Sequence, residues 1–214
     1  MPASVPFVAN PNNRCVPATI GMILAHFMPE LHFTMPELER LTGYQPGKGT
    51  WQTQSMLSLA GLGFELEWIE DFDWPRFARE PESYLKSILS PEAFRWQLEN
   101  GDLPGAAAEW QKYRSLGLPF TQRKGTVADI KRLLDKGWLV RLEVNAQPLA
   151  DKPGYDGHSV LVIGYNQDGV ILHNPDGANG NRPNQHVDWQ LLDAAWGGFG
   201  GSYALYGFYK SKVE

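Results

Sequence analysis

Three residues in this sequence, Cys15, His158 and Asn174, are of the types that together carry out nucleophilic chemistry on an acyl group. A cysteine attacks a carbonyl carbon as the thiolate, and a neighbouring imidazole can take the thiol proton and later protonate a leaving amine. A third polar side chain that accepts the ring N–H holds the imidazole in the useful tautomer. The sequence therefore predicts Cys15 as the nucleophile, His158 as the general base and Asn174 as the residue that orients the histidine.

Cys15 stands where the chain is expected to enter its first long helix. The stretch CVPATIGMILAHFM carries apolar residues at helical spacing, Pro17 suits a first helical turn, and the Met28-Pro29 pair is expected to end the helix. A sulfur at this position lies near unsatisfied backbone N–H groups and the positive end of the helix dipole. We therefore expect a lowered thiol pKa and a favoured thiolate.

A β-hairpin is predicted from His158 onward, because two β-branched runs, SVLVIGYN and VILHN, flank the turn sequence QDG. If Tyr165 pairs with Gly169, Asn174 falls opposite Val160, on the same face as His158 and one diagonal away. Diagonal neighbours are about 7–8 Å apart, within reach of long side chains. A register slip by one residue would put Asn174 on the wrong face.

Acyl chemistry also requires donors for the developing oxyanion, usually backbone N–H groups and a side-chain amide. The amide of Asn10, five residues before the cysteine, is the candidate side-chain donor, with Asn12 and Asn13 as rivals. The Cys15 backbone N–H is the candidate second donor. The histidines and the single cysteine lack metal-ligand spacing, and GKGT at 47–50 lacks the spacing of a phosphate loop, so neither a metal nor a cofactor is expected.

The elements that must position these residues follow an α+β pattern, with a helical amino-terminal half and then a mostly antiparallel sheet. We predict one domain over residues 1–214, with an insertion or lid at about 70–121 that holds short helical patches such as Pro91 to Leu98. The expected elements outside it are helices at 15–28, 35–41, 51–62, 126–137 and 187–196 and strands at 64–69, 138–144, 158–165, 170–174 and 202–209, with a glycine-rich turn before the last strand.

Composition limits the partners. The net charge of -5 lacks the basic excess that binding to nucleic acid or to an anionic membrane surface requires. No apolar run is long enough for a membrane span and no signal peptide is visible, so a cytoplasmic location is expected. One cysteine excludes an internal disulfide framework. The oligomeric state stays open.

The segments VPFVANPNNRCVPATIGMIL and GHSVLVIGYNQDGVILHNPDG resemble the cysteine motif and the histidine strand of the bacteriocin-processing (double-glycine leader) peptidases, within the papain-like cysteine peptidase superfamily. His158 and Asn174 are sixteen residues apart, which is also the spacing between the histidine and the third triad residue in that family. The likeness covers roughly residues 5–66 and 122–176. It implies a papain-like fold and a peptidase that acts on a peptide or protein through a thioester.

The sequence departs from that family at three positions. Asn174 occupies the position where these relatives usually have aspartate. Asn10 occupies the position of the glutamine that donates to the oxyanion, and Val16 replaces the glycine that usually follows the cysteine. Two alternatives therefore stay open beside an amide hydrolase. One is an acyltransferase or transpeptidase that uses the same Cys-His-Asn site, and the other is a catalytically silent peptide-binding domain of the same fold.

Overall fold

The computed structural model describes residues 4–197 and 201–211, and within them seven strands form one sheet in the order β2-β1-β7-β3-β4-β5-β6. The strands are β1 (Glu65–Glu70), β2 (Thr121–Gln122), β3 (Leu139–Asn145), β4 (Gly157–Tyr165), β5 (Gly169–Asn174), β6 (Arg182–Asp188) and β7 (Leu205–Tyr209). The short β2 pairs with β1 in parallel, and the other neighbouring strands pair antiparallel. The sheet is therefore mostly antiparallel, as predicted.

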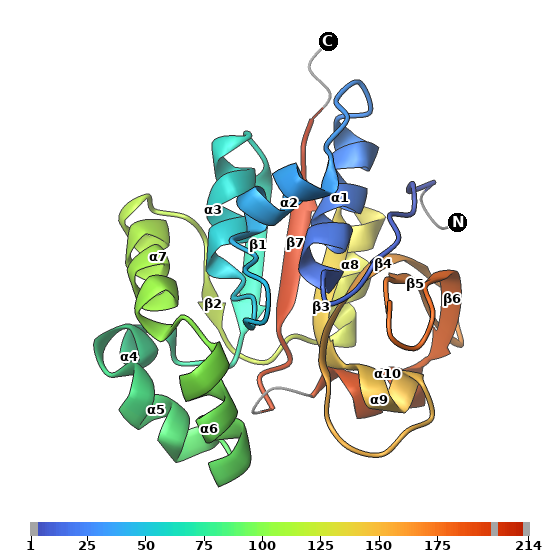
Figure 1. Cartoon of the computed structure of the whole chain (residues 1–214). Coiled ribbons are helices and arrows are strands. Elements are labelled where there is room, and N and C mark those ends of the chain that lie inside the picture. Colours follow the sequence, from blue (N-terminus) through green and yellow to red (C-terminus); the bar gives the residue numbers. More distant parts are fainter. Residues whose placement is uncertain (1–3, 198–200, 212–214) are drawn as a thin grey trace.

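Ten helices of the described residues pack around this sheet (Figure 1). They are α1 (Cys15–Phe27), α2 (Met35–Thr42), α3 (Thr53–Gly61), α4 (Trp74–Arg79), α5 (Pro81–Ile88), α6 (Pro91–Asn100), α7 (Leu103–Ser115), α8 (Val127–Asp135), α9 (Ala146–Leu149) and α10 (Trp189–Trp196). None of these described helices is long and apolar enough to cross a lipid bilayer.

Side chains alternate between two hydrophobic cores along the central strands. On β4, Leu161 and Ile163 join the core that contains α1, α3, α4 and α7, whereas Val160 and Val162 join the core of α8 and α10. This alternation follows from the two-residue repeat of a strand, and it explains why SVLVIGY is apolar at nearly every position. The sheet is thus covered by helices on both faces.

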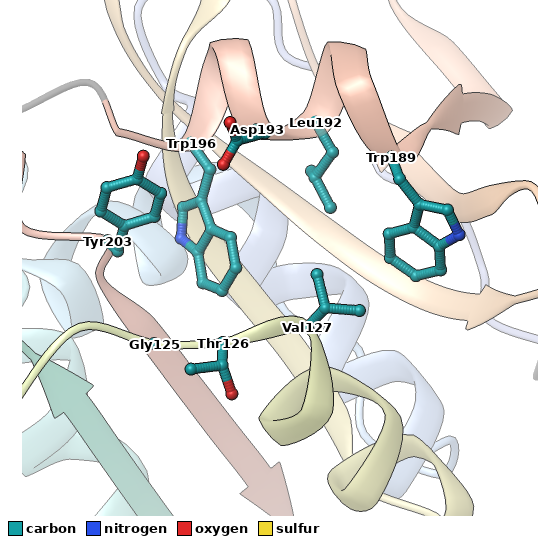
Figure 2. A pocket seen from close by; sticks show the side chains of 8 residues that line it. All are labelled: Gly125, Thr126, Val127, Trp189, Leu192, Asp193, Trp196 and Tyr203. Atoms are coloured by element: carbon teal, nitrogen blue, oxygen red, sulfur yellow. The ribbon is translucent and has the colours of Figure 1, made fainter.

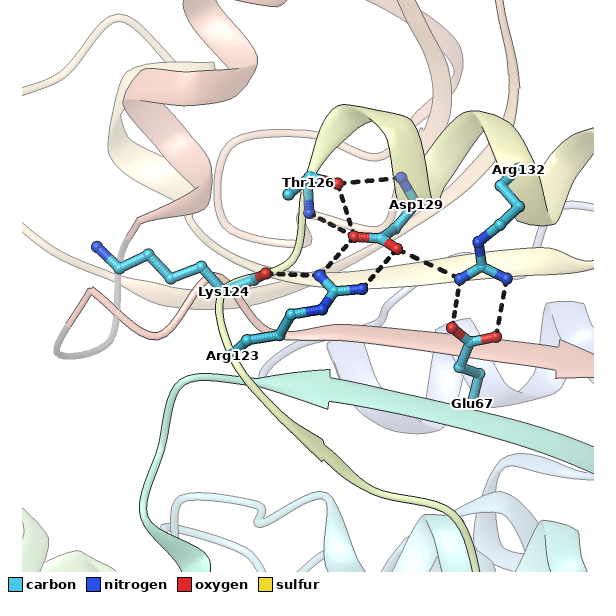
Figure 3. Close-up of polar contacts among 6 residues, drawn as sticks. All are labelled: Glu67, Arg123, Lys124, Thr126, Asp129 and Arg132. Carbon is cyan, nitrogen blue, oxygen red and sulfur yellow. Dashed lines mark hydrogen bonds and ion pairs between the residues drawn. The ribbon is translucent and has the colours of Figure 1, made fainter.

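Helix α8 is fixed to the sheet by a polar network at its amino terminus (Figure 3). Thr126 and Asp129 form a capping box. The Thr126 hydroxyl accepts a hydrogen bond from the backbone N–H of Asp129 and donates one to the Asp129 carboxylate. The Asp129 carboxylate also accepts two hydrogen bonds from the Arg123 guanidinium, at 2.7 and 2.8 Å. Arg132 joins this carboxylate to Glu67 of β1.

The segment 70–121, expected as an insertion or lid, folds into helices α4 to α7 and strand β2 and packs on a cluster of aromatic rings. Trp68 of β1 lies at its centre, in edge contact with Trp74 of α4 at 5.2 Å and with Trp110 of α7 at 5.4 Å. The buried carboxylate of Glu70 accepts hydrogen bonds from the indole N–H groups of Trp68 and Trp74, both at 2.9 Å. That this segment acts as a lid stays a prediction.

The expected elements near the end of the chain need one correction. Residues 182–188 form strand β6, which was not foreseen, so the last helix begins at Trp189 rather than near Val187. The Asp188 side chain caps α10 by accepting from the N–H of Leu191 at 2.8 Å. The strand escaped notice because RPNQHVD is exposed at most positions and lacks an apolar alternation. Part of the expected glycine-rich turn, residues 198–200, lies outside the described residues.

Candidate active site

The first part of the predicted site is a hydrogen bond between His158 and Asn174, with 2.8 Å between Nε2 and Oδ1. Both side chains are buried. The strand register explains their meeting, because Leu161 pairs with His173 and Val162 with Leu172, as the predicted hairpin requires. The residues nearest the turn depart from the prediction.

At the turn, Tyr165 pairs with Val170 rather than with Gly169. A β-bulge between Val162 and Gly164 absorbs the extra residue, so the site end of the hairpin keeps the predicted register. Asn166 closes the turn, since its Oδ1 accepts from the backbone N–H of Gly169 at 2.9 Å.

The orientation of the Asn174 amide defines the tautomer of His158. An amide oxygen can only accept a hydrogen bond, so Nε2 of His158 carries the ring proton. The other end of the amide, Nδ2, donates to Oε1 of Gln185 on β6 at 2.9 Å. The lone pair of His158 is therefore on Nδ1, the nitrogen that remains to accept a proton.

Cys15 is the first residue of α1 and is half-buried. The backbone N–H groups of Val16 and of Ser159, the residue that follows His158, lie close enough to its sulfur to lower the thiol pKa. The first helix therefore packs against β4, whose second residue is His158. This contact joins segments 144 residues apart, since it links positions 15 and 159.

The segment before Cys15 is held against β5 and the loop that follows it. Nε2 of His173 donates to the carbonyl of Val5 at 2.9 Å, and Phe7 lies edge-on to the same imidazole at 5.2 Å. Further along, the backbone N–H of Asn10 donates to Oδ1 of Asn181 at 2.8 Å. These contacts fix the point at which α1 starts.

The expected low pKa of the thiol is wrong. Burial raises the pKa of Cys15 to about 12, and the carboxylate of Glu143 raises it further, outweighing the two backbone N–H groups and the guanidinium of Arg141. The position at a helix start was visible in the sequence, but the burial and the carboxylate depend on the sheet. These surroundings favour the neutral form of the thiol.

Glu143 and Arg141 are charged residues of this site that the sequence did not reveal. The carboxylate of Glu143 accepts from the hydroxyl of Ser159 at 2.7 Å, directly across the β3–β4 pair. Arg141 is fully buried, with its guanidinium 4.5 Å from the ring centre of Tyr206 and its Nε 3.8 Å from a Glu143 oxygen. Burial raises the pKa of Glu143 to about 7, although Arg141 opposes this rise. The sequence signal for these two residues was a pair of charges within the otherwise apolar strand LVRLEVN.

Asn10 is buried and uses both ends of its side chain. Its Oδ1 accepts from the backbone N–H of Arg14 at 2.9 Å, and its Nδ2 donates to the carbonyl of Pro175 at 2.8 Å. The amide therefore connects the start of α1 with the residue that follows Asn174. Its role toward an oxyanion stays a prediction, for which the second N–H of the amide would serve.

A hollow of about 130 Å³ opens elsewhere, between the start of α8 and α10 (Figure 2). Trp189, Trp196 and Tyr203 form much of its wall, and Asp193 stands at its side. None of the four predicted site residues lines it. The hollow is therefore separate from the predicted site.

Comparisons with known proteins agree with the resemblance seen in the sequence. Residues 96–204, just over half of the chain, match the Peptidase_C39 like family. The chain belongs to this family. The matched range includes His158 and Asn174, whereas Cys15 and Asn10 precede it.

Two solved structures are similar to the chain. The peptidase domain of Streptococcus ComA, a bi-functional ABC transporter involved in a quorum sensing pathway, is 13% identical over 95% of both chains, with a TM-score of 0.48. A putative C39-like peptidase from Bacillus anthracis is 17% identical over 53% of this chain and 60% of its own, with a TM-score of 0.33. A search of curated proteins gave no match.

Proposed function

We propose that the protein is a cysteine peptidase with Cys15 as nucleophile, His158 as general base and Asn174 as the residue that orients the imidazole. The packing of α1, which begins with Cys15, against β4, which contains His158, carries this proposal, and the Ser159 N–H next to His158 lies close enough to the sulfur to act on the thiol pKa. The hydrogen bond from Nε2 of His158 to Asn174 supports it, because it leaves Nδ1 as the base.

In the first step, Nδ1 of His158 takes the thiol proton while sulfur adds to the carbonyl carbon of a peptide bond. Collapse of the tetrahedral adduct breaks the C–N bond, and the imidazolium gives its proton to the leaving amine. Water then adds to the thioester, with His158 again as base, and the carboxylic acid leaves as the thiol is restored. No cofactor takes part, and the substrate is a peptide or protein.

The state of the thiol defines how this chemistry would begin. Because burial and Glu143 raise the thiol pKa, we expect proton transfer to His158 to accompany attack rather than precede it. Substrate binding beside the sulfur would also change the surroundings that now oppose the charge. The backbone N–H of Cys15 and the Asn10 amide are our candidates for the oxyanion donors.

The test is Cys15→Ser and His158→Ala, each incubated with a mixture of synthetic peptides and analysed by mass spectrometry. We expect hydrolysis in the unmodified protein and a loss of at least about a hundredfold in each variant, the lower end of what a general base contributes. The melting temperature of Cys15→Ser should stay nearly unchanged, since one atom is replaced at a half-buried position. Hydrolysis that persists in both variants would exclude this site.

A catalytically silent peptide-binding domain is the second candidate, and the raised thiol pKa favours it. The two candidates differ in the reactivity of Cys15 toward an epoxide inhibitor. A peptidase should be labelled much faster than free cysteine, and His158→Ala should remove the difference. Labelling no faster than that of free cysteine would support the binding domain.

A further inference from the structure

The Asn174 amide has two chemically different ends, and the site works with only one of them facing His158. With Oδ1 toward the imidazole, the amide accepts the Nε2 proton at 2.8 Å. Rotated by 180°, the amide would present an NH₂ group to that proton. Donor would then face donor, and the imidazole would favour the other tautomer, with the proton on Nδ1.

A second contact opposes this rotation. Nδ2 of Asn174 donates to Oε1 of Gln185 at 2.9 Å, so each end of the amide has a partner of the right kind. Rotation of Asn174 alone would lose both hydrogen bonds and bring like groups together at both ends, so the Gln185 amide would have to rotate with it to restore the second contact. A carboxylate at position 174 would not need this partner, because both of its oxygens accept hydrogen bonds.

A β-bulge in β6 places Gln185 for this contact. Gln185 pairs with Leu172 while Arg182 pairs with Asn174, so β6 carries one residue more than β5 between the two pairs. Asn184, in the bulge, has a positive φ of 54°, and its N–H donates to Nδ1 of His173 at 3.1 Å. The half-buried Gln185 thereby lies diagonal to Asn174 at the edge of the sheet.

We propose that Gln185 is a positioning residue of the active site, which holds the Asn174 amide with its oxygen toward His158. The inference rests on the proposed function for its catalytic consequence, but the tautomer of His158 can be observed without any reaction. The hydrogen bond from Asn174 is the contact through which Gln185 would act on the imidazole.

The experiment compares Gln185→Leu, which keeps the size of the side chain but has no acceptor, with Gln185→Glu, which keeps an acceptor. Gln190→Leu, at an exposed position on α10, is the matched control. The readout is the ¹⁵N spectrum of histidine-labelled protein, with His158 assigned by His158→Gln. We expect one tautomer, with the proton on Nε2, in the unmodified protein, in Gln185→Glu and in the control, and a mixture in Gln185→Leu.

If the protein hydrolyses peptides, Gln185→Leu should lower kcat about tenfold and leave KM within about twofold, as expected for the loss of one hydrogen bond that orients the base. The same substitution in an Asn174→Asp background should change neither the tautomer nor kcat. An unchanged His158 spectrum in Gln185→Leu would overturn the proposal, and so would an equal effect of Gln185→Glu in a folded protein. Because the spectrum requires no turnover, failure of the peptidase proposal would be seen separately.

Discussion

The carboxylate of Glu143 opposes ionisation of the Cys15 thiol, and its own pKa of about 7 makes this effect dependent on pH. The groups that act on Glu143 are Arg141, Ser159, His158 and Glu70. Above neutral pH the carboxylate is charged and raises the thiol pKa, whereas below neutral pH it is protonated and this effect fades.

Glu143→Gln should therefore speed the alkylation of Cys15 by iodoacetamide between about pH 7.5 and 9. Each unit by which the thiol pKa falls gives tenfold more thiolate, partly offset by lower nucleophilicity, for a net gain of roughly threefold. The two proteins should converge below about pH 6. Because Cys15 is the single cysteine of the sequence, the labelled site is unambiguous. The control is Glu67→Gln, and equal rates for Glu143→Gln and the unmodified protein at pH 8.5 would contradict the prediction.

At the scale of elements, His173 ties the amino-terminal segment to the sheet as a neutral ring. Burial lowers the pKa of His173, although the contact with the Val5 carbonyl opposes this. Below about pH 6.5 the unfolded chain binds a proton that the folded protein resists, so the free energy of unfolding should fall as the pH falls toward the folded pKa.

His173→Phe should remove this slope and destabilise the protein by about 1–3 kcal/mol at neutral pH, because the carbonyl of Val5 and the N–H of Asn184 lose their partner. Urea unfolding between pH 5 and 8 measures both effects. The control is His32→Phe, since His32 is exposed and should leave the slope in place. If the free energy of unfolding of His173→Phe still falls with pH, another titratable group causes the slope.

The start of helix α8 depends on Asp129, whose pKa is held well below its usual range by the Arg123 guanidinium (Figure 3). A lowered carboxylate pKa contributes stability that is present above the unfolded pKa of about 3.9 and is lost as the pH falls below it. Asp129→Asn should thus cost about 1–2 kcal/mol at neutral pH, the size of a lost cap. The difference from the unmodified protein should shrink below about pH 4 in urea unfolding. Asp193→Asn, on the exposed side of α10, should show no such difference.

Some elements of the structure could be predicted from the sequence and others could not, for physical reasons. The hairpin from His158 to Asn174 was predictable, because β-branched runs and a short turn specify local pairing. Strand β6 and Gln185 were not, since an exposed edge strand with a proline carries no apolar pattern. The thiol pKa was missed because it depends on burial and on Glu143, which only the assembled sheet brings near Cys15.

At the scale of the whole molecule, the aromatic cluster joins the segment 70–121 to the sheet. Trp110 of α7 is buried, stacks on Trp74 of α4 at 5.4 Å and meets Trp68 of β1. Because these rings couple the segment to the core, we expect one cooperative unfolding transition for the protein.

Trp110→Ala should lower the free energy of unfolding by about 3–5 kcal/mol, as removal of a large buried ring does. Trp96→Ala should cost less than about 1 kcal/mol, because the Trp96 side chain is 48% exposed. Urea unfolding followed by circular dichroism and by tryptophan fluorescence measures both. Two separate transitions in the unmodified protein would mean that residues 70–121 fold independently of the sheet.

Strand β7 (Leu205–Tyr209) lies inside the sheet, third of seven strands, although it is the last of the described strands along the chain. Among the described strands, it is the one that pairs with both β1 and β3, as the central red arrow in Figure 1 shows. During synthesis, a ribosome has therefore already made both the cysteine helix and the histidine hairpin before the strand that unites their supports emerges. A polypeptide cut short before residue 205 would contain Cys15 and His158 but would lack the strand that pairs with both β1 and β3.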